Sequence, residues 1–299
     1  MENLIKFDNV DHYNRFNSHK TLHPLVSIVD FSKAGPRQGS SMSFGLFAVM
    51  LKDIKSGDIR YGRHYYDYQD GTLIFFSPGQ VVTVESDVEF YQPEGHALVF
   101  HPDLLRGTSL GRHMDEYPFF AYHAHEALHL SEWERQVVLD CLAKIQHELL
   151  QPIDKHSKKV IVTYIELLLN YCTRFYDRQF ITREHVNKGI VERFEELLNA
   201  YFKSDKPQIV GLPSVSWCAV ELNLSANYFG ELIKKEIGKS PLEYIQNKLI
   251  DEAKERIFDP NKSISEVAYE LGFKYPNHFT RLFKLKVGQS PNQYRSSLN

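Results

Sequence analysis

Basic side chains gather without acidic neighbours near the C-terminus of this 299-residue chain. Residues 271–299 contain five lysines and arginines and no aspartate or glutamate. These cations are Lys274, Arg281, Lys284, Lys286 and Arg295. The chain as a whole has a formal net charge of -3. Residues 1–187 contain 19 Lys and Arg against 24 Asp and Glu, whereas residues 188–299 contain 16 Lys and Arg against 14 Asp and Glu. The local excess of positive charge therefore predicts a surface that binds phosphate groups.

One sequence pattern occurs twice in the same region, fifty residues apart. Residues 224–244 and 274–294 have eight identical positions at that offset. The matched pairs are Asn227/Asn277, Phe229/Phe279, Leu232/Leu282, Lys234/Lys284, Gly238/Gly288, Ser240/Ser290, Pro241/Pro291 and Tyr244/Tyr294. A chain with two copies of a helix-turn-helix unit is most simply interpreted as a bipartite reader of DNA.

Each copy has the apolar spacing and the end signals of a helix. Apolar residues at i, i+3, i+4 and i+8 form one buried face. A glycine suited to the left-handed conformation ends each helix, and Ser-Pro begins the next one. We predict helix-turn-helix units at about 214–237 and 263–287, with a capping box from Ser263 to Glu266 in the second. Upstream residues match at an offset of 49 rather than 50, so the second turn should contain one extra residue.

A continuous helix is predicted between the two units. Residues 241–258 have apolar side chains four apart, namely Ile245, Leu249, Ala253 and Ile257. Eighteen residues at the helical rise span roughly 27 Å, which is comparable with the ~34 Å pitch between successive major-groove faces of B-DNA. A rigid helix of this length would place both reading helices on the same side of a duplex.

The first 125 residues are predicted to be rich in β-strands. Short apolar runs are separated by turn signals, among them Pro78-Gly79, which fits the centre of a type II turn. The runs lie at 44–51, 72–76, 81–84, 97–100 and 119–122. Several short antiparallel strands at this spacing are typical of a small barrel or jelly roll.

Two helices are predicted after the strands, over residues 131–150 and about 157–176. Ser131 is placed to cap the first helix. Its apolar stripe consists of Trp133, Val137, Cys141 and Ile145. The stripe of the second helix consists of Val160, Tyr164, Leu168, Tyr171 and Phe175. A turn that contains Pro152 would let the two helices pack as a hairpin.

These elements predict an α+β protein with two domains. The N-terminal domain, residues 1–180, would contain the strands and a helical part at about 131–176. The C-terminal domain, residues 188–299, would be all-α with two helix-turn-helix units. The polar segment 177–188 is predicted to be the linker, because it interrupts the helical period on both sides.

The C-terminal residues resemble the AraC family of bacterial transcription regulators. The family signature stands here as Ala268, Gly272-Phe273, Phe279, Phe283-Lys284, Gly288, Ser290-Pro291 and Tyr294-Arg295. The match covers about 110 residues. The remainder resembles, by arrangement rather than by motif, the cupin-like sensor domain and helical hairpin of many members. The resemblance therefore implies a cupin-like barrel before a DNA-binding domain.

In the second unit, the resemblance implies contacts with double-stranded DNA along the exposed face of the recognition helix. Asn277, His278 and Arg281 would contact base edges, since arginine favours guanine and asparagine favours adenine. Thr280 and Lys284 would contact phosphate groups. Helix capping is the alternative role for Asn277, which lies near the predicted helix start.

In the first unit, the matching positions are less typical of base readers. They are Asn227, Tyr228 and Glu231, with Lys234 and Lys235 toward the DNA backbone. Gly230 has no side chain to read a base, and the carboxylate of Glu231 repels phosphate unless it accepts from cytosine. Asn227, like its counterpart, has helix capping as an alternative role. We therefore expect weaker base reading from this unit, which would still help to position the protein.

The resemblance also implies the role of the N-terminal domain. It would bind a small-molecule effector or a partner, whose contact residues the sequence does not identify. An aromatic set on the predicted strands could line such a pocket, although aromatic residues on strands are usually core. The set is Phe44, Phe47, Tyr61, His64, Tyr65, Tyr66 and Tyr68. The helical hairpin would form a homodimer interface or dock the reading domain, and an activator would in addition contact RNA polymerase.

Two enzyme classes remain as alternatives, a metal-dependent cupin enzyme and an alkyl-transfer repair protein that carries a DNA-binding domain. His123 and His125 resemble half of a cupin metal motif, but a third histidine and a glutamate at the right spacing are not evident. Alkyl transfer needs a reactive cysteine with metal-binding cysteines near the N-terminus, and the first cysteine here is Cys141. We expect no catalytic residue, no metal and no cofactor.

Composition favours an ordinary globular protein, with 42% hydrophobic and 24% charged residues. Cys141, Cys172 and Cys218 lack metal-ligand spacing and are expected to be buried. The N-terminus has no apolar signal region, and no apolar stretch approaches the length of a membrane span. The sequence alone thus predicts a cytoplasmic protein without a membrane partner.

Overall fold

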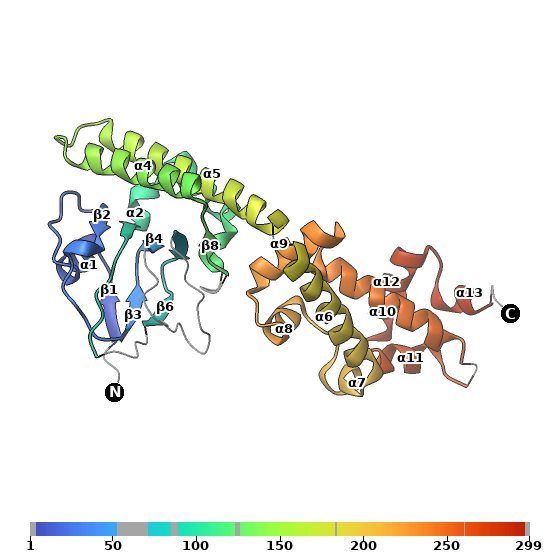
Figure 1. Cartoon of the computed structure of the whole chain (residues 1–299). Coiled ribbons are helices and arrows are strands. Elements are labelled where there is room, and N and C mark those ends of the chain that lie inside the picture. Colours follow the sequence, from blue (N-terminus) through green and yellow to red (C-terminus); the bar gives the residue numbers. More distant parts are fainter. Residues whose placement is uncertain are drawn as a thin grey trace. The chain divides into compact units, whose positions relative to one another are not determined.

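The computed structural model describes residues 4–52, 71–84, 89–122, 126–182, 184–259 and 261–296. Its contacts divide the chain into two compact units, Met1–Thr182 and Arg183–Asn299, called unit 1 and unit 2 below (Figure 1). Unit 1 contains the strands, whereas the described part of unit 2 is helical. This mixture confirms the predicted α+β class.

The described residues of unit 1 form two β-sheets. The smaller has the strand order β1-β3-β6 and the larger β2-β7-β4-β5-β8. Neighbouring strands pair antiparallel, except that β1 and β3 are parallel. The strands are β1 (Leu4–Phe7), β2 (Val26–Asp30), β3 (Ser40–Phe44), β4 (Phe47–Lys52), β5 (Thr72–Phe76), β6 (Val81–Val84), β7 (His96–Phe100) and β8 (Leu128–His129). The strands predicted at 72–76, 81–84 and 97–100 are confirmed.

The predicted turn at Pro78-Gly79 is present, whereas two of the predicted strands need correction. Gly79 has a φ of +91°. The run 44–51 is divided between the end of β3 and most of β4. The run 119–122 falls largely in the short 3-10 helix η3 (Pro118–Ala121), because proline has no N–H to donate to a neighbouring strand.

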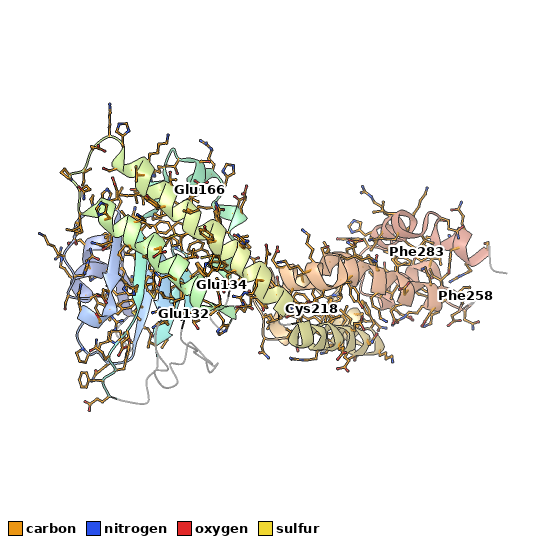
Figure 2. All side chains as sticks on the ribbon, turned by 45° about the horizontal axis from the view of Figure 1, so that its top comes forward. Glu132, Glu134, Glu166, Cys218, Phe258 and Phe283 are labelled. Carbon is orange, nitrogen blue, oxygen red and sulfur yellow. The ribbon has the colours of Figure 1, made fainter. Side chains whose placement is uncertain are left out.

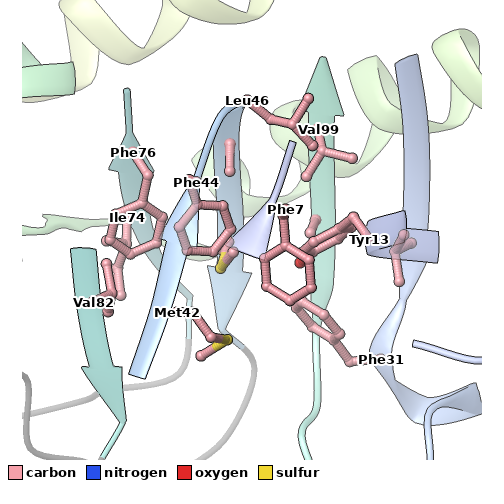
Figure 3. Packing of buried hydrophobic residues seen from close by; sticks show 14 of the residues in the cluster. Phe7, Tyr13, Phe31, Met42, Phe44, Leu46, Ile74, Phe76, Val82 and Val99 are labelled. Atoms are coloured by element: carbon pink, nitrogen blue, oxygen red, sulfur yellow. The ribbon is translucent and has the colours of Figure 1, made fainter. Parts of the chain in front are cut away.

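Aromatic and aliphatic side chains from both sheets form the core of unit 1 (Figure 3). Phe44 stacks on Phe76 with ring centroids 5.2 Å apart, and Phe47 stacks on Phe100 at the same distance. These two members of the aromatic set are therefore packed against other rings, as strand aromatics usually are. The remaining members of that set lie outside the described residues.

Two long helices, α4 (Glu132–Leu149) and α5 (Ser157–Thr182), pack along each other as the predicted hairpin (Figure 1). Ser131 caps α4 in a capping box with Glu134. The buried stripe is rotated from the predicted one, since Trp133 is 60% exposed. Its apolar members are Val138, Cys141, Leu142, Ile145 and Leu149. The shorter helices of unit 1 are α1 (Val10–Phe16), η1 (Phe31–Lys33), α2 (Pro102–Leu105), α3 (Ser109–Arg112), η2 (Met114–Glu116) and η3.

The segment 177–188, which is predicted to be the linker, contains the boundary between unit 1 and unit 2. Its described residues are helical, because α5 continues to Thr182 and α6 begins at Glu184. Within the segment, Gln179 is a polar side chain that is buried and hydrogen-bonded. Its amide donates to the carbonyl of Ala127 at 3.1 Å and accepts from the N–H of His129 at 2.7 Å. Gln179 thus serves as a contact with the β8 region.

Unit 2 is built from helices around buried aromatic rings. Phe194 packs edge to face on Phe229 with centroids 5.0 Å apart, and Phe279 lies 5.7 Å from Phe283, which Figure 2 labels. The described helices are α6 (Glu184–Lys203), α7 (Lys206–Val210), α8 (Val215–Glu221), α9 (Ala226–Ile237), α10 (Pro241–Ile257), α11 (Ile264–Glu270), α12 (Pro276–Val287) and α13 (Pro291–Ser296). The continuous helix predicted at 241–258 is confirmed as α10.

Candidate nucleic-acid interface

Two helix-turn-helix pairs, α8–α9 and α11–α12, occupy the repeated sequence. α9 ends at Gly238 with φ +75°, and α12 ends at Gly288 with φ +86°. Each glycine N–H donates to the carbonyl of the lysine four residues before it at 2.9 Å. Ser240 and Ser290 then accept the N–H three residues on, at 3.2 and 3.3 Å. The duplicated stop and start signals are confirmed.

The two turns differ in length, as the 49-residue offset predicts. α8 ends at Glu221 and α9 begins at Ala226, whereas α11 ends at Glu270 and α12 begins at Pro276. The second turn is therefore one residue longer. Its tight part contains Gly272, which has a φ of +95°.

The outer face of α12 presents the polar side chains that the family resemblance selects. Asn277, His278, Arg281 and Lys284 are exposed, and Thr280 is half-buried. Neither Arg281 nor Lys284 has an ion-pair partner within the described part of the chain, which leaves both cations available to an external anion. The phenylalanines of the opposite face are fully buried, so the orientation of α12 is fixed by packing.

The sequence reasoning missed Leu285, which is 80% exposed on the same helix. Positions 278, 281 and 285 follow the helical spacing of i, i+3 and i+7, so Leu285 lies on the face that carries His278 and Arg281. An exposed apolar side chain there can contact the methyl group of thymine. The spacing itself was visible in the sequence, but a leucine in an amphipathic helix is normally assigned to the core.

On α9 the structure separates the selected residues. Asn227, Lys234 and Lys235 are exposed, and Glu231 is half-buried. Tyr228 is only 5% exposed, because its side chain packs inside unit 2. Its assignment to the DNA-contacting face is therefore corrected, and fewer of the selected side chains are exposed on α9 than on α12.

Helix capping does not account for the two matched asparagines. The N-cap of α9 is Ser225, whose hydroxyl accepts the N–H of Tyr228 at 3.1 Å. The N-cap of α12 is Tyr275, followed by Pro276 at the first helical position. Asn227 and Asn277 thus lie inside the first turn of their helices.

One cation of the C-terminal cluster has a structural role instead. The guanidinium of Arg295 donates to the carbonyl of Ile257 at 2.7 Å and to that of Lys262 at 2.9 Å. These bonds satisfy carbonyls at and just beyond the C-terminal end of α10, where a positive charge is favourable. The predicted phosphate-binding surface therefore loses Arg295 and keeps Lys274, Arg281, Lys284 and Lys286.

α10 joins the two helix-turn-helix pairs. Its 17 residues correspond to a length of about 26 Å. Arg256 near its C-terminal end donates to the carbonyls of Phe202 at 2.6 Å and of Glu270 at 3.4 Å. α10 also packs against α9 of the first pair and against α11 and α12 of the second, which gives the two pairs a fixed spacing.

The two enzyme alternatives require a metal site or a reactive cysteine, and the described residues can be checked for both. All three cysteines are buried, and burial raises the pKa of the Cys141 thiol to about 11 and of the Cys218 thiol to about 12. Such thiols are poor nucleophiles. Within the described ranges, no group of three histidine, cysteine or acidic side chains could hold a metal ion. His123 and His125 lie outside the described residues.

No described helix is long and apolar enough to cross a membrane.

The capped helix pairs and their connecting helix define unit 2 as a double helix-turn-helix domain. A family model described as a helix-turn-helix domain matches residues 218–297. The uncharacterized transcriptional regulator YfiF of Bacillus subtilis is 29% identical over 154 residues, which cover 49% of this chain and 46% of that protein. LumQ, a probable transcriptional regulator of Photobacterium leiognathi, is 33% identical over 142 residues, 48% of this chain and 52% of its own length.

Among solved structures, the chain is similar to the C-terminal domain of the response regulator AraT from Geobacillus stearothermophilus, with 28% sequence identity and a TM-score of 0.32. The match covers 36% of this chain and 84% of the AraT domain. The chain spans about half the length of YfiF and of LumQ. Together with the repeated motif, the matched family model identifies the C-terminal part of this chain as a helix-turn-helix domain of the AraC type.

Proposed function

We propose that this chain is a sequence-specific transcription regulator in which unit 2 binds double-stranded DNA. The main observation in support of the proposal is that α12 has two different faces. One face buries two phenylalanines fully, and the other exposes Asn277, His278, Arg281 and Lys284. Packing on one side holds the helix rigid, so the other side can enter a major groove with its side chains already oriented. The transcriptional regulators among its relatives support the same function.

Each exposed residue has a role within this proposal. Asn277, His278 and Arg281 would contact base edges, Leu285 a thymine methyl group, and Thr280 and Lys284 phosphate groups. On α9, Asn227 and Glu231 would contact bases, and Lys234 and Lys235 phosphates. α9 would therefore contribute more to positioning than to specificity, and α12 would dominate the choice of sequence.

Arg281→Ala and Lys284→Ala should affect DNA binding differently. Arg281→Ala should cost about 1–3 kcal/mol of binding free energy and relax the preference at one base position, because a bidentate contact with guanine is lost. Lys284→Ala should weaken binding to all sequences alike and reduce the salt slope by about 1, because one phosphate contact is lost. Binding to a randomised duplex library at several salt concentrations measures both effects.

Lys203→Ala is the matched control. Lys203 is exposed on α6, so its substitution removes the same charge outside the reading helices. It should leave the sequence preference unchanged. An equal loss across all sequences for Arg281→Ala would show that Arg281 contacts the backbone and not a base.

The fragment 183–299 should fold and bind DNA without unit 1. Its helices enclose their own core, and the contacts of the chain divide at this boundary. We expect a helical circular dichroism spectrum with a cooperative thermal transition, and DNA affinity that depends on Arg281. A fragment that stays disordered would contradict the proposed independence of the domain.

Unit 1 would bind a small-molecule effector and thereby change the population of states in which reading domains reach their half-sites. Its α4–α5 hairpin would serve in self-association or in docking of unit 2, and Trp133 at the start of α4 is 60% exposed. RNA polymerase would be a further partner if the protein activates transcription.

A further inference from the structure

A basic cavity lies in unit 1 between the loop that joins α2 to α3 and the beginning of α5. Its volume is about 530 Å³. Four cations line it, namely Arg106, Lys155, Lys158 and Lys159. Val162, which is 5% exposed, contributes to the apolar part of its wall, and Glu166 of α5 is its acidic member (Figure 2). The cavity therefore combines a cationic rim with one carboxylate.

The rim is held by contacts between residues that are distant in sequence. The ammonium group of Lys158 donates to the carbonyl of Arg106 at 3.0 Å, which joins α5 to the loop. Nε of Arg106 lies 2.9 Å from Oδ1 of Asp103, so that carboxylate orients the guanidinium. Lys155 and Lys159 have no ion-pair partner among the residues described, and both side chains are exposed.

The charge of this cavity is opposite to the net charge of residues 1–187. That part of the chain contains 19 Lys and Arg against 24 Asp and Glu, yet four cations lie around one cavity. Asp103 pairs with Arg106, so the repulsion that a bound anion would relieve is that among the three lysines. The N-terminus of α5 does not supply the attraction, because Asp154 already accepts the N–H of Ser157 at 2.9 Å. Binding would thus depend on the side chains.

We propose that this cavity binds a small phosphorylated metabolite that also carries hydroxyl groups, such as a sugar phosphate. The ammonium groups of Lys155 and Lys159 and the guanidinium of Arg106 would surround the phosphate, for which charge-assisted hydrogen bonds are strong. The carboxylate of Glu166 would accept from a ligand hydroxyl and disfavour a ligand that is only a polyanion. The effector role of this ligand rests on the proposed regulatory function, whereas its binding does not.

Calorimetric titration of the full chain with ribose phosphate, ribose and inorganic phosphate at constant ionic strength tests the proposal. Ribose phosphate should bind, ribose should not, and inorganic phosphate should bind more weakly than ribose phosphate. Lys155→Gln with Lys159→Gln should weaken the binding of ribose phosphate by about 10-fold or more, since each substitution removes a charged donor. Added salt should weaken binding to the unsubstituted chain.

The matched control is Lys144→Gln with Arg174→Gln, which removes two exposed cations from α4 and α5 outside the cavity. It should bind ribose phosphate as the unsubstituted chain does. Lys159→Gln alone, with its melting temperature measured, separates a loss of affinity from a loss of folding.

Three results would overturn the proposal. One is equal affinity of the two double variants for ribose phosphate, and another is the absence of binding by any phosphate probe at millimolar concentration. The third is displacement of ribose phosphate by duplex DNA of random sequence, which would show that the cluster binds nucleic-acid backbone. None of these results bears on base reading by α12, so failure here and failure of DNA binding are distinguishable.

Discussion

Gly272→Ala is expected to destabilise unit 2 by about 3 kcal/mol or more. Gly272 has a φ of +95°, where a side chain costs conformational energy. A Cβ atom there would also lie 2.8 Å from the carbonyl carbon of Gly211 and 2.8 Å from the carbonyl oxygen of Pro207. These are backbone atoms that cannot rotate away, so α7 and the turn before α12 would have to separate. DNA affinity should fall with the loss of this packing.

Gly288→Ala provides the matched control. Gly288 has a similar φ of +86°, but no heavy atom lies within 4 Å of the position that its Cβ would take. Only the conformational cost of about 1 kcal/mol is then expected. Urea denaturation, followed by the fluorescence of Trp217 in a Trp133→Phe background, reports on unit 2. Similar losses for the two variants would show that the close approach at Gly272 does not contribute.

The helix-turn-helix units were predictable because their signals are local. A glycine that ends a helix, a Ser-Pro that begins the next one, and an apolar face at helical spacing each depend on a few neighbouring residues. Gly238 and Gly288 accordingly have the left-handed conformation, and the extra residue of the second turn is present. The selection of Arg281 came from the family resemblance, and the apolar spacing of the opposite helix face agrees with it.

Predictions from residue type failed where a polar side chain serves the interior. Gln179 belongs to the polar segment that is predicted to be the linker, but its amide is paired with His129 of β8 and with Ala127. Arg295 looked like a phosphate ligand, but its guanidinium is bonded to the carbonyl of the last residue of α10 and to that of Lys262. Tyr228 has the polar tip of a base reader and lies buried. Composition shows that a side chain is polar, but it does not show which group that side chain is hydrogen-bonded to.

The basic cavity of unit 1 was beyond the reach of local patterns. Arg106 and Lys158 are separated by about fifty residues, and only the packing of α5 on the α2–α3 region brings them together. A run of lysines at a helix start is ordinarily a solvated surface. Whether such a run forms part of a binding site depends on a second segment, whose position in space the sequence does not show.

Arg178→Ala is expected to destabilise unit 1 by about 2–3 kcal/mol. The guanidinium of Arg178 donates to both carboxylate oxygens of Glu134, at 3.0 and 2.6 Å, and to the carbonyl of His129 at 2.7 Å. The side chain of Glu134, labelled in Figure 2, is 7% exposed. Removal of one partner of a buried ion pair is costly because the other charge stays buried. Since Arg178 is 37% exposed, we place the loss below the usual range for fully buried pairs.

The loss caused by Arg178→Ala should also depend on pH. Burial by itself would raise the pKa of Glu134, but hydrogen bonds from Arg178 and Ser131 outweigh it and hold that pKa below its ordinary value of 4.5. A carboxyl group whose pKa is lower in the folded state stabilises the fold above its unfolded pKa, and this contribution is lost as the pH falls through the folded pKa. The unsubstituted chain and the variant should therefore differ fully near neutral pH and converge below pH 4.5.

Arg174→Ala is the control for Arg178→Ala, because Arg174 is exposed on the same helix and makes no ion pair within the described residues. It should change the free energy of unfolding little at any pH. Denaturation of both variants from neutral pH to below pH 4.5 separates two explanations. A difference that shrinks with falling pH identifies the charge pair as its source, because protonated Glu134 no longer needs a cation. A constant difference would instead attribute the loss to the bond with His129 and to packing of the arginine stem.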